Sequence, residues 1–178
     1  SITSERGQTM DNFDDEIRSL ATTVLERCRA LGWKAATAES CTGGLIAGAL
    51  TAIPGSSNVI HGGFVTYSNR AKSEMLGIDP DMIDEHGAVS KQVACAMAKG
   101  AQKETRTSLA VAVTGIAGPS GGSADKPVGL VHFACSDGKK SSHIVRKFGD
   151  IGREEIREET VRVALTLVLA CVDQRTLP

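Results

Sequence analysis

The feature that most constrains the fold is an uninterrupted apolar run, Leu109-Ala110-Val111-Ala112-Val113. Apolar and polar residues do not alternate along it, and this pattern is typical of a strand that is covered on both faces. Such strands lie inside sheets that carry helices on each side. The run therefore predicts the central strand of an α/β domain, and the rest of the chain must supply helices for two faces.

The surrounding segments alternate between the periodicities of helices and strands. Hydrophobic spacing, caps and breakers predict helices at 12–31, 45–53, 69–77, 91–104 and 153–173, strands at 33–38 and 60–67, and a polar connector at 78–89. Because connections between parallel strands are right-handed, these helices distribute over both faces. We expect a three-layer α/β/α sandwich around a mixed, mostly parallel sheet of about five strands.

A loop and a hairpin complete the prediction. Residues 115–127 are rich in glycine and proline and predict an irregular loop. The segments 128–135 and 141–148 read as strands, and Asp137-Gly138 between them is a hairpin signal, so this pair is antiparallel. No linker interrupts the pattern. We expect a polar tail at 1–11 and a single domain at 12–178.

Composition narrows the class of partner. The chain has 20 basic and 21 acidic side chains and 3% aromatic residues, so neither a long-range field nor stacking platforms favour nucleic acid. No apolar run is long enough for a membrane span, and no secretion signal is evident. The five cysteines are odd in number and far apart, which favours reduced thiols in a cytoplasmic protein. The broadly apolar closing helix favours a homo-oligomer.

Three segments follow predicted strands, at the edge where ligands bind in open α/β sheets: 39–44, 66–72 and 114–122. The first places Ser40, Thr42, Gly43 and Gly44 at the start of a helix, where free N–H groups and the helix dipole favour an anion. That anion can be a phosphate or an oxyanion. The third segment, from Thr114 onward, offers backbone N–H groups but lacks the lysine-serine ending of a P-loop.

The second segment supplies a base. A helical lysine is ordinarily a solvated surface residue, but Lys72 follows a strand end beside that of Ser40, so the two can meet. A neutral lysine can take the proton of a serine hydroxyl, provided that burial or nearby positive charge lowers its pKa. Arg70 and Arg153 are candidates for that charge. Tyr67 can orient the amine or donate to a leaving group.

Other nucleophiles and ligands are weaker candidates. Cys41 competes with Ser40, but no histidine can be placed beside it, so a small buried side chain is the simpler reading. His61 and His132 lie in predicted strands and read as core or interface residues, whereas His86 and His143 lie in polar segments. Their spacing indicates no metal site, and we expect no metal or other cofactor.

Several motifs in one order resemble a known family. They are Thr37-Ala38-Glu39-Ser40-Cys41-Thr42-Gly43-Gly44, Gly63-Phe64-Val65-Thr66-Tyr67-Ser68-Asn69, Lys72, His86-Gly87-Ala88-Val89-Ser90, Thr114-Gly115-Ile116-Ala117-Gly118-Pro119, Gly121-Gly122-Ser123 and Lys126-Pro127-Val128-Gly129. Together they resemble the CinA C-terminal domain family, from about residue 13 to residue 172, and that family includes nicotinamide-mononucleotide deamidases.

The resemblance implies a metal-free serine-lysine amidohydrolase, a nicotinamide-nucleotide amidase that converts nicotinamide mononucleotide and water to nicotinate mononucleotide and ammonia in pyridine nucleotide recycling. By the family's pattern Ser40 is the nucleophile, Lys72 the base and Tyr67 an accompanying site residue. The substrate-binding positions carried over are Thr42, Gly43, Gly44, Asn69, Thr114, Gly115 and Arg153.

Two departures accompany the resemblance. The family commonly runs Gly-Asp-Arg, whereas Ile151-Gly152 here separates Gly149-Asp150 from Arg153, the arginine expected at the phosphate. Some relatives carry a further N-terminal domain resembling molybdopterin-binding proteins, and we expect this chain to be the stand-alone form.

Two alternatives to this function remain. They are an amidase of another small substrate, and a non-catalytic nucleotide-binding or competence- and damage-associated domain.

Overall fold

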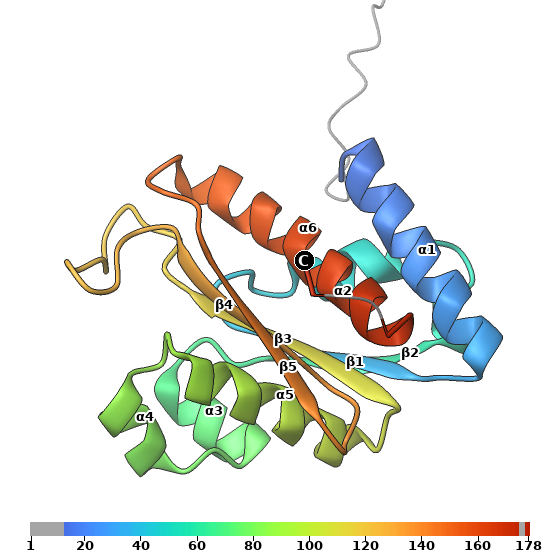
Figure 1. Cartoon of the computed structure of the whole chain (residues 1–178), viewed down its shortest axis with the longest axis horizontal. Coiled ribbons are helices and arrows are strands. Elements are labelled where there is room, and N and C mark those ends of the chain that lie inside the picture. The colour runs from blue at the N-terminus through green and yellow to red at the C-terminus, as the bar shows by residue number, and fades with distance from the viewer. Residues whose placement is uncertain (1–12, 175–176) are drawn as a thin grey trace, which may run out of the picture.

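A five-stranded mixed sheet forms the centre of the computed structural model, which describes residues 13–174 and 177–178 (Figure 1). The strands lie in the order β2-β1-β3-β4-β5. Their bounds are β1 Ala35–Glu39, β2 Ile60–Val65, β3 Leu109–Gly115, β4 Leu130–Ser136 and β5 Ser141–Lys147. β1 is parallel to β2 and β3, while β4 is antiparallel to both of its neighbours. The predicted hairpin and the central position of 109–113 are confirmed.

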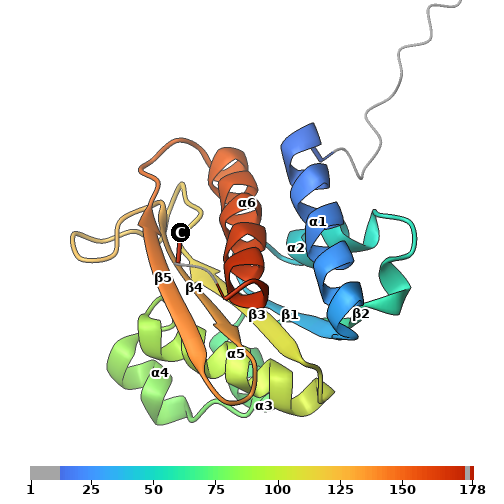
Figure 2. The same ribbon diagram turned by 45° about the vertical axis from the view of Figure 1, so that its right-hand side comes forward.

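Helices cover both faces of this sheet, as Figures 1 and 2 show from two directions. One layer contains α1 (Asp15–Leu31), α2 (Leu45–Thr51) and α6 (Arg153–Val172); the other contains α3 (Asn69–Leu76), α4 (Pro80–His86) and α5 (Lys91–Thr105). A short 3₁₀ turn, η1 (Ser56–Asn58), precedes β2. The three-layer α/β/α prediction is thus confirmed. The broad apolar surface of α6 packs against α1, α2, β3 and β4 within the chain.

One predicted element is wrong and others shift at their ends. The expected connector at 78–89 contains α4, because Asp79 caps it by accepting from the Asp81 N–H and Pro80 occupies its first turn. β4 begins at Leu130 rather than at Val128. The predicted tail at 1–11 lies outside the described residues, as does the predicted helix start at 12.

The two helical layers pack against the sheet with side chains of different size. Towards α1, α2 and α6, the sheet presents large residues such as Val111, Val131 and Phe133. Towards α5 it presents alanines, namely Ala36, Ala38, Ala110, Ala112 and Ala134. The facing side of α5 also carries the small residues Ala94, Ala98 and Ala101. Small side chains on both surfaces let α5 lie close to the sheet. The end of α3 in turn packs closely against α5 at Gly100.

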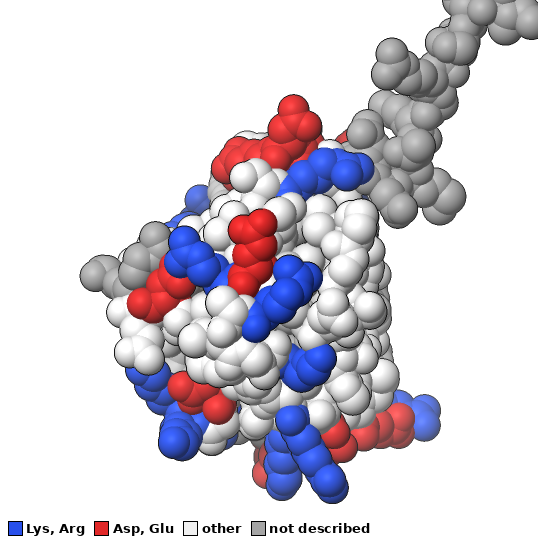
Figure 3. Space-filling model, turned by 90° about the vertical axis from the view of Figure 1, so that its right-hand side faces the viewer, with Lys and Arg blue, Asp and Glu red and all other residues white. Residues whose placement is uncertain are grey.

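The outer surface facing the viewer in Figure 3 carries both signs of charge side by side, over the end of the molecule that holds α1 and β2. This mixture agrees with the formal net charge of −1. Among the described helices, none combines the length and apolarity that crossing a membrane requires.

Close packing of α5 predicts a large effect of one methyl group. A Cβ added at Gly100 would lie 2.2 Å from the backbone oxygen of Leu76, at the end of α3, and backbone moves less readily than a side chain. We expect Gly100→Ala to lower the free energy of unfolding by about 1–3 kcal/mol despite the better helix propensity of alanine. Urea denaturation followed by circular dichroism measures this.

Gly48→Ala is the matched control, because Gly48 is also helical and its added Cβ would meet only the Phe13 ring at an ordinary 3.6 Å. This variant should be neutral or up to about 1 kcal/mol more stable. Equal stability of the two variants would contradict the close approach of α5 to α3.

Candidate active site

A serine and a lysine meet at the carboxyl end of the parallel strands. Lys72 Nζ lies 3.0 Å from Ser40 Oγ and donates a hydrogen bond to it. Both groups are buried, with 8% of Ser40 and 1% of Lys72 exposed. The juxtaposition predicted from neighbouring strand ends is therefore present in the structure.

Local structure fixes both side chains. Successive residues of a strand point to opposite faces, so Glu39 points towards α2 and Ser40 lies on the side of α3. β2 remains paired beyond its last residue, because the Thr66 N–H donates to Glu39 O. Ser68 then caps α3 by accepting from the Ala71 N–H. Lys72 follows one turn later and projects back towards the sheet.

Oxygen atoms surround the Lys72 amine. Besides Ser40 Oγ, it donates to the backbone oxygen of Thr66 at 2.9 Å and to that of Tyr67 at 3.3 Å. No salt bridge between described residues involves Lys72. Burial disfavours the ammonium form and lowers the pKa of Lys72 below its ordinary value. The amine is thus positioned to act as a base.

The source of this pKa shift differs from the sequence prediction. Arg70 was expected to supply repulsive charge, but its side chain is 83% exposed and pairs with Glu74 at 2.6 Å. Arg153 is not a cause of the shift either, since desolvation is the lowering influence on the pKa of Lys72. Burial, and not nearby positive charge, lowers the pKa of Lys72.

A buried carboxylate occupies the start of α2. Glu39 accepts from the Thr42 hydroxyl at 2.6 Å, from the Ile46 N–H at 2.8 Å and from the Ala47 N–H at 3.0 Å. Burial raises the pKa of Glu39, and these donors oppose that rise. The helix start that the sequence offers to a ligand anion is therefore filled by the chain's own acid.

A cavity of about 230 Å³ opens beside the Ser40–Lys72 pair. Its walls bring together most of the predicted site residues: Ser40, Tyr67, Asn69, Lys72, Thr114, Gly115 and Arg153 line it, with Cys41, Ala88, Val89 and Ala117. Thr42, Gly43 and Gly44 are not on these walls. Thr114 is held by a hydrogen bond from its hydroxyl to Ala88 O at 2.9 Å.

Two arginines at the start of α6 bind the segments around this cavity, and Arg153 also lines it. Arg153 donates to Gly118 O at 2.7 Å and to the Tyr67 hydroxyl at 3.0 Å, so it joins the glycine-rich loop to β2's end. Arg157 donates to Cys41 O at 3.1 Å and Thr42 O at 3.3 Å, behind the nucleophile turn. Sequence reasoning missed Arg157, although its position one turn after Arg153 places both on one helix face.

The phenol of Tyr67 lies away from the amine that it was expected to orient. The residue is 61% exposed and its hydroxyl accepts from Arg153, whereas the backbone oxygen of Tyr67 accepts from Lys72. The residue therefore contributes to both sides of the cavity through different atoms.

The competing nucleophile and ligands are placed differently. Cys41 is buried, and desolvation raises the pKa of its thiol to about 12, so the expectation of a small buried side chain is confirmed. His132 and His143 contact each other, Nδ1 to Nε2, at 2.9 Å on the strands β4 and β5. Within residues 13–174 and 177–178, no three His, Cys, Asp or Glu side chains gather as metal ligands do.

Comparison with known proteins identifies a family. The family model for the CinA C-terminal domain matches residues 17–172. The chain belongs to the CinA C-terminal domain family. The resemblance drawn from the motifs is therefore confirmed.

Solved structures of CinA proteins have the same fold. The competence/damage inducible protein CihA from Agrobacterium tumefaciens is 52% identical, with a TM-score of 0.89 over 93% of this chain and 100% of that one. A CinA superfamily protein from Escherichia coli is 33% identical, with a TM-score of 0.84 over 90% of this chain and 94% of that one.

Curated relatives named CinA-like protein are longer. The relative from Synechococcus sp. (strain RCC307) is 49% identical over 163 residues, which are 91% of this chain and 39% of that protein. The relative from Mycobacterium marinum is 52% identical over 135 residues, 75% of this chain and 31% of that protein. This chain thus spans between about a third and two fifths of these relatives.

The donors around Glu39 predict that its second oxygen is required for stability. Glutamine has one oxygen, so in Glu39→Gln an NH₂ group must face either the Ile46 or the Ala47 N–H. We expect the free energy of unfolding to fall by about 1–3 kcal/mol, measured by urea denaturation. Glu74→Gln removes an exposed carboxylate and should change it by less than about 0.5 kcal/mol. A neutral Glu39→Gln would show that the acid does not hold α2.

Proposed function

We propose that this CinA-family domain is an amidohydrolase that converts nicotinamide mononucleotide to nicotinate mononucleotide and ammonia by a serine-lysine mechanism. The observation that carries the proposal is the buried 3.0 Å contact between Lys72 Nζ and Ser40 Oγ. Among the described residues, Lys72 is bound to a hydroxyl and two carbonyl oxygens and is 1% exposed, so it has the surroundings of a base rather than of an ion-pair partner.

Counting donors and acceptors explains how the neutral amine fits. A neutral lysine has two N–H donors and one lone pair, which match the Thr66 and Tyr67 oxygens and the Ser40 hydroxyl, respectively. When Lys72 loses its proton the contact with Ser40 reverses, and the hydroxyl donates to the amine. Ser40 then attacks the carboxamide carbon, Lys72 takes its proton and passes one to departing ammonia, and water releases the acid.

The oxyanion requires donors that are not already engaged. At the start of α2, the Gly43 N–H donates to Ser40 O and the Leu45 N–H to Thr42 O, while Ile46 and Ala47 bind Glu39. In the β3–β4 ladder the Ile116 N–H points to Leu130 O, so the N–H of Gly115 points the other way, towards β1 and the cavity. We therefore place the oxyanion beside Gly115 rather than at the helix start, where the sequence suggests an anion.

The substrate's charges suit the remaining walls. A phosphate needs a cation, and Arg153 lines the cavity with its guanidinium held between the Tyr67 hydroxyl and Gly118 O. The pyridinium of a nicotinamide nucleotide is positive and would further disfavour the protonated form of Lys72. A mononucleotide with both charges fits the proposal better than free nicotinamide does.

Removal of either reacting group should abolish turnover. We expect Ser40→Ala and Lys72→Met each to reduce ammonia release from nicotinamide mononucleotide by at least about 1000-fold, because each removes a group that the chemical step requires. Lys103→Met, which changes an exposed helical lysine in the same way, should keep full activity. Circular dichroism and urea denaturation check that each variant is folded.

Three substrates separate the alternatives in the same assay. Release from the mononucleotide but not from nicotinamide or its riboside supports the role of the phosphate. Turnover of another amide alone would overturn the substrate assignment, and binding of the mononucleotide without ammonia release would overturn the enzymatic one. Near-normal activity of Ser40→Ala would remove the nucleophile from the mechanism.

The lowered pKa of Lys72 predicts the pH dependence of the rate. Only the neutral amine can accept a proton, so kcat/KM should rise about tenfold per pH unit below the pKa of Lys72. Because that pKa is lowered, the plateau should begin at a pH below the ordinary lysine pKa of about 10.4. Arg70→Ala should leave the profile unmoved, because burial and not Arg70 lowers this pKa. A rate that falls with rising pH across the neutral range would contradict a lysine base.

A further inference from the structure

A second group of nucleophilic side chains lies at the other end of the sheet. Cys135 on β4 and Cys171 on α6 lie close enough for each thiol to shift the pKa of the other. Both line a small cavity of about 110 Å³. This cavity also touches Leu109, the first residue of β3, whereas the Ser40 cavity touches Gly115, its last. The two sites are therefore separated by the length of β3.

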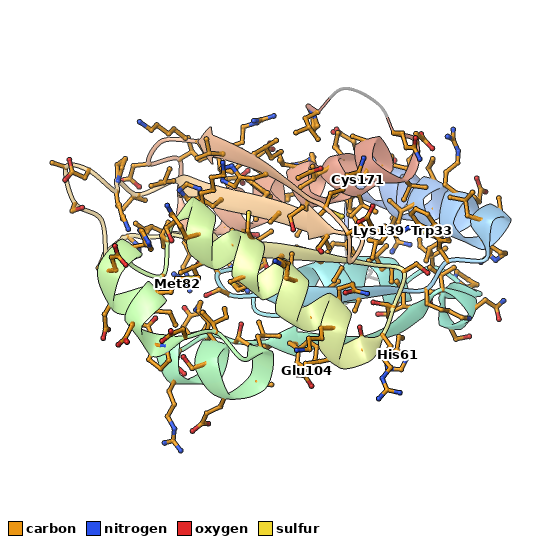
Figure 4. All side chains as sticks on the ribbon, turned by 60° about the horizontal axis from the view of Figure 1, so that its bottom comes forward. Trp33, His61, Met82, Glu104, Lys139 and Cys171 are labelled. Carbon is orange, nitrogen blue, oxygen red and sulfur yellow. The ribbon has the colours of Figure 1, made fainter. Side chains whose placement is uncertain are left out.

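The two thiols have unequal access to the surface. Cys135 is buried between the sheet and α6, but Cys171 is half-buried near the end of the helix. Figure 4 shows Cys171 at the same end of the molecule as Trp33 and the Lys139 turn, far from Met82. Because both thiols line the cavity, a small molecule that enters it meets Cys171, the more exposed of the two, next to Cys135.

The surroundings of Cys171 favour a thiolate. The neighbouring Cys135 thiol is the main cause of the lowered pKa of Cys171, and the Ser142 hydroxyl and the charge of Lys140 act in the same direction. Asp137 and burial oppose this shift.

The other four cysteines show the opposite tendency. Burial raises the pKa of the thiol to about 11 in Cys28 and to about 12 in Cys41, and it also raises the pKa of Cys95. The neighbouring Cys171 thiol and burial raise the pKa of Cys135. Since the thiolate is the reactive form, the chain has one thiol favoured for reaction.

We propose that Cys171 is a peroxide-reactive thiol and that Cys135 resolves its oxidised form as a disulfide. The Cys171 thiolate attacks one oxygen of hydrogen peroxide, the O–O bond breaks, and hydroxide leaves and takes up a proton, so sulfur is oxidised to a sulfenic acid. The Cys135 thiol then attacks that sulfur, the S–O bond breaks, and water leaves as the S–S bond forms. This proposal is independent of the amidase activity.

Trypsin separates the relevant thiols, which makes the oxidation directly observable. Cys171 falls in peptide 163–175, Cys95 in peptide 92–99, and Cys135 in a third peptide. We expect hydrogen peroxide at neutral pH to give a cross-linked peptide joining Cys135 to Cys171, lighter than the sum of its parts by two hydrogen atoms. Intact Cys171 with an oxidised Cys95 would overturn the proposal.

Variants test the two roles separately. Cys171→Ser should abolish the cross-link, and Cys135→Ser should leave a sulfenic acid on Cys171 that dimedone traps. Cys95→Ser is the matched control and should cross-link like the unchanged chain. If Cys171 of the unchanged chain is oxidised but remains unlinked, Cys135 is not the resolving thiol and the proposal fails.

An alkylation rate supplies a readout that does not need oxidation. At neutral pH we expect iodoacetamide to modify Cys171 about 5-fold or more faster than Cys95, the larger thiolate fraction outweighing the weaker nucleophilicity of a more acidic thiol. In Cys135→Ala, which removes the neighbouring thiol that lowers the pKa of Cys171, the rate at Cys171 should fall, whereas Cys95→Ser should not affect it. Equal rates at Cys171 and Cys95 would contradict a favoured thiolate.

Discussion

Burial of the Lys72 amine is the interaction on which the site depends. An ammonium group taken out of water is costly unless an opposite charge accompanies it, and the described structure gives Lys72 only neutral oxygens. The group is therefore driven towards its neutral form, and this requires α3 to be held firmly against the sheet. The alanine surface between α5 and the sheet provides that support, because Leu76 at the end of α3 lies directly against α5 at Gly100. In the proposed mechanism, close packing remote from Ser40 thus contributes to its activation.

The alternation of β1 separates two groups that would otherwise interfere. Glu39 and Ser40 are neighbours in sequence, but one points to the α2 layer and the other to α3. An acid on the side of Lys72 would stabilise the ammonium and remove the base. On the α2 side the same acid satisfies the open N–H groups of a helix start. Because Glu39 occupies the start of α2, a ligand anion cannot bind there. The guanidinium of Arg153 then remains as the cation on the cavity wall.

The parts of the site that follow from topology were predictable, and those that follow from packing were not. Ser40 and Lys72 meet because the carboxyl ends of parallel strands lie side by side, and the apolar run at 109–113 was enough to indicate such a sheet. The missed helix α4 had a local signal in Asp79-Pro80. By contrast, the cause of the Lys72 pKa shift, the role of Glu39 and the contact between Cys135 and Cys171 depend on which atoms are buried together. No spacing in the sequence encodes these.

The extent to which the surroundings stabilise charge explains the difference between the Ser40–Lys72 site and the Cys135–Cys171 pair. At the end of β1, desolvation suppresses charge, so the thiol of Cys41 is kept protonated. The adjacent Ser40 hydroxyl, paired with the Lys72 amine, is the nucleophile that we propose. At the opposite end of β3, the neighbouring Cys135, Ser142 and Lys140 favour a negative charge on the half-buried sulfur of Cys171. A single sheet can therefore carry two independent chemistries, because each depends on how its own end is solvated and not on the residue types alone.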